Sequence, residues 1–184
     1  MKTVNYFCPE CWGSAEAKVE ERSETHIVRD TEIEIVSQNA VCPLCGADID
    51  DPELKDENIQ RAYDVYRKNN GLISPREIRE LRAKYGISQK SLGILLGIGE
   101  ASIVRYEGGS LPTNSNNMLL QNAMNESFIK EAYKKNGSHM PKFQQKKIEA
   151  ALGYEQPSDA SDSVEEISIV GPSVLNYQDD TITL

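Results

Sequence analysis

Long apolar segments are missing from this sequence of 184 residues. It contains no run of about 18 apolar residues, the length that a membrane-spanning helix needs. Residues 1–10 also lack the apolar core of a signal peptide. These absences exclude a helical membrane span, and we expect a cytoplasmic protein with no membrane partner.

Histidine is equally scarce, because the chain holds only His26 and His139. Neither stands near a second candidate ligand or a nucleophile, so both are interpreted as surface residues. No nucleophile with its base, no carboxylate pair and no open metal site can be assembled from the sequence. We therefore do not expect an enzyme.

Basic side chains are outnumbered by acidic ones, and the formal net charge is -9. Taken alone, this net charge argues against a nucleic-acid partner. The charge is unevenly spread, however. Residues 1–57 carry 5 basic and 14 acidic side chains, residues 58–153 carry 15 and 8, and residues 154–184 carry none and 7. A basic middle between acidic ends predicts that the middle meets DNA while the ends meet another partner or solvent.

Cysteine is also rare, but its four copies form two C-x-x-C pairs, Cys8 with Cys11 and Cys42 with Cys45. Disulfides are not expected in a reducing cytoplasm. Two such turns supply four thiolates, the tetrahedral shell that Zn²⁺ prefers, and they leave no open position on the metal. We predict one structural zinc ion. A thioredoxin-like redox pair is the alternative, but the βαβ context that it needs is missing.

The predicted zinc module covers residues 1–51. Gly13 and Gly46 follow the two pairs and can supply the positive φ that such turns often require. Residues 15–21 and 25–39 alternate apolar and polar side chains, which indicates two or three short antiparallel strands. So small a module buries little core, and metal binding worth about 10–16 kcal/mol would fold it.

A linker helix is predicted over residues 52–70, where apolar residues recur at helical spacing from Asp56 to Lys68. Ser74 and Glu77 then form a capping box, which starts a helix that runs to about Tyr85 and ends at Gly86.

The segment from Gln89 has the spacing of a helix-turn-helix, with small or apolar residues at the positions where two helices cross, turn and pack. Counted from Gln89, these positions are the fifth, ninth, tenth, fifteenth and eighteenth: Gly93, Gly97, Ile98, Ile103 and Tyr106. A helical hairpin that touches no DNA could have the same spacing. We predict a DNA-binding domain over residues 71–126, completed by a helix around Met118 to Met124.

The second helix, about Glu100 to Glu107, should turn one face to DNA. Arg105 is the one strong base reader, because its guanidinium can donate twice to guanine. The other predicted DNA contacts are Glu100, Ala101 and Val104 on the same helix, with Ser88, Gln89 and Lys90 opening the helix before it. One base reader is too little for a specific site, so a homodimer on a palindromic operator is expected.

The rest of the chain divides into a helical extension over residues 127–153 and an acidic tail over residues 154–184. Helices are expected around Phe128 to Lys135 and Lys142 to Ala151. The tail has no basic residue and few apolar ones, so we expect disorder there.

The motif order resembles the MqsA/YgiT-type zinc-finger and Xre-like helix-turn-helix antitoxins. It runs C-P-x-C, C-P-x-C-G, linker helix, S-Q-K-x-L-G-x-L-L-G and R-Y-E-x-G, over about residues 5–125. The resemblance implies an α+β chain with an all-α, lambda-repressor-like second domain. It also implies zinc ligands at Cys8, Cys11, Cys42 and Cys45 and a base-reading Arg105. The zinc module would bind a toxin, typically an mRNA-cleaving one, and the dimer would repress its operon. Ala101 stands where the family's best-known member has Asn, which implies a different operator sequence.

Three functions therefore compete. The leading hypothesis is an autoregulating antitoxin of a type II toxin-antitoxin system. The second is a phage or mobile-element transcriptional regulator whose zinc module is purely structural. The third is a protein-interaction adaptor that has lost DNA binding. The toxin's identity, the operator, the dimer interface and the role of residues 127–184 do not follow from the sequence.

Overall fold

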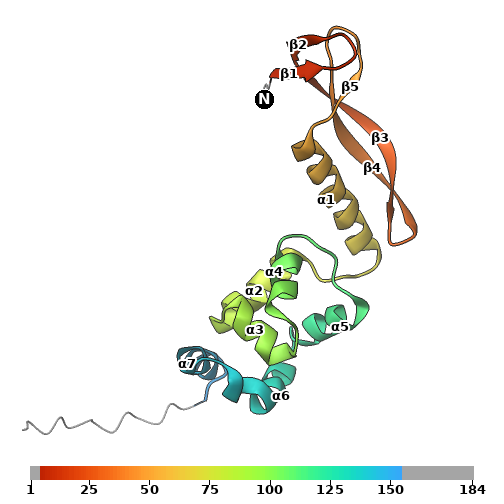
Figure 1. The fold of residues 1–184 in the computed structure, drawn as a ribbon. Helices are drawn as coiled ribbons and strands as arrows, with labels where there is room; N and C mark the ends of the chain where they lie inside the picture. Colours follow the sequence, from red (N-terminus) through yellow and green to blue (C-terminus); the bar gives the residue numbers. More distant parts are fainter. Residues whose placement is uncertain (1–4, 155–184) are drawn as a thin grey trace, which may run out of the picture.

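The computed structural model describes residues 5–154, and all but the first residue of the predicted tail lies outside them. Within this part, five strands precede seven α-helices (Figure 1). The predicted α+β class is confirmed. No helix among the described residues is long and apolar enough to cross a membrane.

The strands form two antiparallel sheets. One is a small hairpin of β1 (Asn5–Cys8) and β2 (Gly13–Glu16). The other has the order β3-β4-β5, built from Lys18–Val28, Thr31–Val41 and Asp48–Ile49. Antiparallel pairing is as predicted, but β3 and β4 have 11 residues each and are longer than the pattern indicated. They meet at a two-residue turn in which Arg29 and Asp30 both have positive φ.

Helix α1 (Pro52–Asn69) lies along β4 and forms the linker. It starts before Asp56 because the Asp51 carboxylate accepts hydrogen bonds from the N–H groups of Glu53 and Leu54. A small apolar cluster joins the helix to the hairpin, made of Val28, Ile33, Ile35 and Ala62. The β3–β4 hairpin and α1 therefore have a packed interface that is separate from the cysteines.

The remaining helices form one bundle around a single apolar core (Figure 1). They are α2 (Pro75–Tyr85), α3 (Gln89–Leu96), α4 (Glu100–Glu107), α5 (Asn114–Asn122), α6 (Glu126–Asn136) and α7 (Lys142–Ala151), with a 3-10 turn at Gly137–His139. The predicted capping box of Ser74 and Glu77 starts α2, and Gly86 ends it with a φ of 62°. Leu92, Ile103, Leu120 and Ile148 are all 0% exposed, so residues from both ends of the bundle share its core.

Two arginines connect the β3–β4 hairpin and α1 to the loop between α4 and α5. Arg67 is buried, and its Nη2 donates to the carbonyl of Gly109 at 2.6 Å. Arg29, in the β3–β4 turn, donates to the carbonyls of Leu111 and Pro112 at 3.1 and 2.7 Å. The two halves of the molecule therefore meet at this loop, through its backbone carbonyls and through Leu111, which packs against the cluster between β3–β4 and α1.

Candidate metal centre and nucleic-acid interface

The fold brings the four predicted zinc ligands together, and their Sγ atoms all lie within 4.8 Å of one another. Cys8 and Cys11 come from the β1–β2 hairpin, whereas Cys42 and Cys45 come from the loop between β4 and β5. The Cys8–Cys45 sulfur distance is 3.5 Å and the Cys11–Cys42 distance is 3.8 Å. Four sulfurs bound about 2.3 Å from one tetrahedral zinc ion lie about 3.8 Å apart. The donor set therefore fits a single metal ion.

Backbone hydrogen bonds shape the second turn and tune its thiols. The N–H groups of Cys45 and Leu44 donate to the Cys42 sulfur and lower the pKa of that thiol to about 7. The Ala47 N–H also acts to lower the pKa of Cys45, but the neighbouring Cys8 thiol and burial raise it to about 12. Four crowded thiols resist ionising together, and a bound cation would remove that resistance.

The prediction about glycine is right for one turn and wrong for the other. Gly46 has a φ of 75°, as expected. In the first turn the positive φ, 54°, falls on Trp12 and not on Gly13, because both turns place it at the residue after the second cysteine. A left-handed conformation costs a residue with a side chain roughly 1–2 kcal/mol. Tryptophan therefore stands at a position where glycine would be less strained.

Three exposed apolar side chains come from the two cysteine turns and were not predicted from the sequence. Trp12 is 82% exposed and packs edge-on against Phe7, which is 56% exposed, with ring centroids 6.1 Å apart. Leu44, from the other cysteine pair, is 71% exposed. We call Phe7, Trp12 and Leu44 the knuckle patch. The available signal was Trp12 itself, the only tryptophan in the chain, directly after a C-x-x-C pair.

Helices α3 and α4 have the close crossing that the spacing predicts. A Cβ atom at Gly93 would lie 2.6 Å from the Ile98 carbonyl oxygen, so no larger residue fits without movement. Gly97 ends α3 with a φ of 69°, and Ile103 and Tyr106 are buried beneath the pair. The geometry of this two-helix unit matches the pattern, and its DNA binding stays a prediction.

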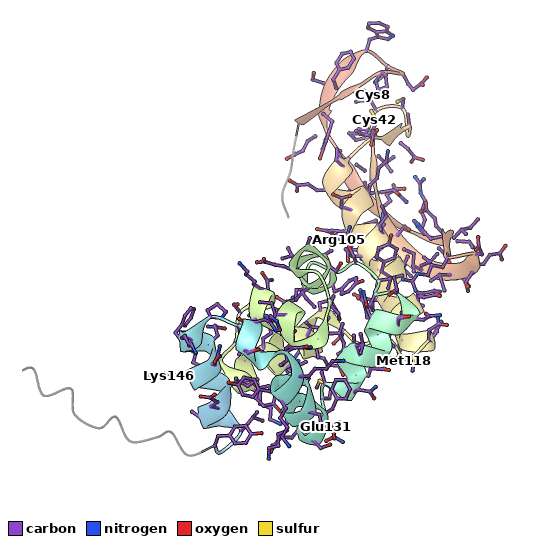
Figure 2. All side chains as sticks on the ribbon, turned by 60° about the horizontal axis from the view of Figure 1, so that its bottom comes forward. Cys8, Cys42, Arg105, Met118, Glu131 and Lys146 are labelled. Atoms are coloured by element: carbon purple, nitrogen blue, oxygen red, sulfur yellow. The ribbon has the colours of Figure 1, made fainter. Side chains whose placement is uncertain are left out.

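Four predicted base-facing residues share one surface of α4. Glu100, Ala101, Val104 and Arg105 are all exposed and together line one shallow depression. The Arg105 guanidinium makes one weak local contact, from Nη2 to Ser102 Oγ at 3.3 Å. Its remaining donors are available on the outside of the helix (Figure 2).

The predicted phosphate contacts at the start of α3 are partly engaged within the domain. The Ser88 hydroxyl accepts from the Ser91 N–H at 3.1 Å and caps the helix. The side-chain amide of Gln89 is half-buried and donates to Glu107 Oε2 at 2.8 Å. Lys90 alone of the three presents an exposed, uncommitted cation. The structure thus favours Lys90 over the Ser88 and Gln89 side chains as a phosphate contact.

Glu107 is the electrostatic anchor that holds α2 against α4. Its side chain is 6% exposed, and Arg82 donates to both carboxylate oxygens, at 2.5 and 2.9 Å. Arg79 donates to the Glu107 backbone carbonyl at 2.6 Å. Burial acts to raise the pKa of Glu107, but hydrogen bonds from Arg82 and Gln89 outweigh it and hold the pKa below its ordinary value. Two arginines of α2 therefore serve the fold.

Fold and site together define a class of protein: an N-terminal domain with a four-cysteine group that could hold a metal ion, followed by an all-helical domain. Residues 6–127 match the family described as the antitoxin component of bacterial toxin-antitoxin system, MqsA. The chain belongs to the MqsA antitoxin family, which confirms the resemblance in sequence. Most of α6 and all of α7 lie beyond the matched residues. A search of curated proteins finds no match to this chain.

Proposed function

We propose that this chain is an antitoxin with two docking surfaces: a zinc-folded N-terminal domain that binds its toxin, and an α3–α4 unit that binds a palindromic operator as a dimer. Membership of the antitoxin family implies a toxin as partner. The assignment of each surface to one partner is the finer proposal. The observation that carries it is that the strained, exposed Trp12 and the exposed Arg105 lie in different domains, Trp12 beside the cysteines and Arg105 on α4 of the helical bundle.

Support for the toxin surface comes from the knuckle patch. A backbone outlier at an exposed residue is a reason to suspect function, because the strain has no benefit to packing there. Trp12 satisfies that condition with a φ of 54° and 82% exposure. Exposed tryptophans are frequent centres of protein interfaces. The surrounding domain is strongly acidic, which suits a basic partner such as an RNA-cleaving toxin.

Zinc has an indirect role in this proposal. A closed four-thiolate shell has no position for substrate or water, so the metal would act by holding the two cysteine turns together. Those turns carry Trp12 and Leu44 from distant parts of the sequence. Metal binding by Cys8, Cys11, Cys42 and Cys45 would therefore assemble the toxin surface.

Support for the DNA surface comes from α4. Arg105, Ala101 and Val104 lie on its exposed face, and Ile103 and Tyr106 anchor the opposite face in the core. A bidentate arginine contact with guanine is worth about 1–3 kcal/mol of discrimination. A two-fold dimer would repeat that contact in each half-site of a palindrome.

The toxin surface is tested with Trp12→Gly, a change that removes the aromatic ring and relieves the positive-φ strain. The variant should keep its metal and its thermal stability but lose at least tenfold in affinity for the toxin encoded next to it. Ile27→Ser is the matched control, because Ile27 is 77% exposed on the same domain but lies near the β3–β4 turn. Equal toxin binding by wild type and Trp12→Gly would contradict the role of the knuckle patch as the toxin surface. A neighbouring gene product that is harmless when expressed alone would contradict the antitoxin function itself.

The DNA surface is tested with Arg105→Ala on the promoter of the chain's own gene. Loss of the contact should weaken specific binding about 5–150-fold per subunit, equivalent to the 1–3 kcal/mol of one bidentate pair. Binding to an unrelated duplex should be nearly unchanged. Lys68→Ala is the control, since Lys68 is an exposed cation on α1 and not on α4. Unaltered promoter affinity in Arg105→Ala would contradict the DNA half of the proposal.

A further inference from the structure

The helical extension has a larger net positive charge than the predicted DNA-binding domain. Residues 71–126 carry six basic and five acidic side chains, whereas residues 127–153 carry six and two. Arginines in the first group are also engaged, because Arg76 pairs with Glu80 and Arg82 with Glu107. A surface that binds phosphates needs cations that are not already paired. Such cations are concentrated in the extension.

Helix α7 is docked directly on the start of α3, where a DNA backbone contact is predicted. The Gln144 side chain is buried, and its Oε1 accepts from the Ser88 backbone N–H at 2.7 Å. One turn later, Lys147 lies against the α2–α3 turn, because a Cβ at Gly86 would be 3.6 Å from its Cδ. The attachment is therefore specific, and it joins α7 to the edge of the predicted interface.

The outer face of α7 is basic. Lys142 and Lys146 are exposed on the side opposite Gln144 and Ile148, and no ion pair within the described residues uses either lysine. Figure 2 labels Lys146 on α7 at the left of the bundle, Arg105 on α4 at its top and Glu131 on α6 at its bottom. Gln144 and Lys147 thus attach α7 beside the start of α3, and Lys142 and Lys146 extend from the opposite, exposed side of that helix.

We propose that α7 is a DNA-backbone clamp: Lys142 and Lys146 bind phosphates that flank the half-site read by α4, and Gln144 fixes the clamp to α3. This inference rests on the proposed operator binding and extends it to a helix outside the family match. The clamp would supply affinity without reading sequence, because phosphate contacts carry no base information.

The test compares two charge-matched double variants of the full chain, Lys142→Gln/Lys146→Gln on α7 and Lys134→Gln/Lys135→Gln on α6. Affinity for the chain's own promoter duplex is measured across a range of salt concentrations. Each lost phosphate contact lowers the slope of log K against log salt by about 0.9. The α7 variant loses two contacts in each subunit of the proposed dimer, so the slope should fall by roughly 3.6 in total, and binding at low salt should weaken about tenfold or more. The preference for promoter over unrelated DNA should stay as in wild type.

The outcomes separate the clamp from the operator proposal. An α7 variant with the wild-type slope, in a protein whose promoter binding depends on Arg105, overturns the clamp alone. Equal losses in both double variants would assign the effect to net charge and also overturn it. A wild-type protein that does not bind its promoter overturns both proposals. Far-ultraviolet circular dichroism and the melting temperature confirm that each variant folds, which is expected because all four lysines are exposed.

Discussion

The two halves of this molecule are stabilised in different ways. The helical bundle has a continuous core in which Leu92, Ile103 and Ile148 are fully buried. Around the cysteines, by contrast, the core cluster contains only four buried residues, and two of them are Cys8 and Cys42 themselves. The helical bundle is therefore held by apolar packing, whereas the cysteine end of the N-terminal half depends on what its thiols bind.

This difference also separates the two proposed surfaces. A domain that a metal ion would hold can expose large apolar side chains such as Trp12, because its fold would not require their burial. A domain with its own core can leave one helix face free for polar recognition, the role proposed for Arg105 on α4. A substitution that destabilises one half should therefore weaken binding at that half's proposed surface and leave binding at the other surface unchanged.

The largest effect is expected for Cys42→Ser, which removes one of four metal ligands. Loss of metal binding removes up to about 10–16 kcal/mol from the N-terminal domain. We expect the β1–β2 hairpin and β5 to unfold while the helical bundle stays folded. Native mass spectrometry should find no zinc, and amide spectra should show disorder for residues 5–16 and 42–49, while β3 and β4 stay packed on α1. A metal-free variant with β1, β2 and β5 intact would contradict the comparison.

The converse change is Leu92→Ala, in the centre of the bundle. Truncation of a fully buried leucine costs about 2–5 kcal/mol, so the urea midpoint of the helical domain should fall markedly. Zinc content should stay at one ion per chain. If the N-terminal domain of this variant unfolds at the same lowered urea concentration, the two halves unfold as one cooperative unit, which would contradict their separate stabilisation.

A smaller effect is expected for Glu107→Gln, which weakens the Arg82 contact. Hydrogen bonds to charged groups contribute about 1.5–3 kcal/mol. Because the folded pKa of Glu107 lies below its ordinary value of 4.5, its contribution is present above that value and is lost as the pH falls through the folded pKa.

Wild-type stability should thus decline below about pH 5, the acid side of the ordinary glutamate pKa. The same melting series on Glu107→Gln should be flatter there. Glu80→Gln is the control, because the Arg76–Glu80 pair is exposed to solvent and contributes little to stability. Identical acid profiles for wild type and Glu107→Gln would show that Glu107 is not the group that titrates.

The smallest effect is expected for Arg29→Ala, at the contact between the halves. The two hydrogen bonds to Leu111 and Pro112 are on an exposed side chain, so the cost should be about 1 kcal/mol or less. Residual dipolar couplings should nevertheless report greater freedom of the hairpin relative to the bundle. Couplings identical to wild type would mean that Arg67 and apolar packing alone fix the orientation.

The sequence predicted those features that depend on local chemistry. The Ser74–Glu77 capping box and Gly86 placed α2 to the residue, and the C-x-x-C spacing identified the four cysteines that the fold brings together into a group that could hold a metal ion. Gly93 revealed the α3–α4 crossing because only a small residue fits there. In each case a few neighbouring atoms determine the outcome.

Features that depend on distant partners were not predictable. The Gln89 amide donates to Glu107, 18 residues away, a contact that the sequence did not indicate; its phosphate contact stays a prediction. The attachment of α7 depends on Gln144 and Ser88, which are 56 residues apart.

The β3–β4 turn was missed for a local reason. Its residues, Arg29 and Asp30, are neither glycine nor asparagine, the residues that normally mark a positive φ.

The most direct test of the account is neutralisation of the toxin in growing cells, with Trp12→Gly and Arg105→Ala compared side by side at equal expression. Two independent surfaces predict that Arg105→Ala rescues growth as well as wild type and that Trp12→Gly does not. Rescue by Trp12→Gly together with failure of Arg105→Ala would contradict the assignment of the toxin to the metal-held half.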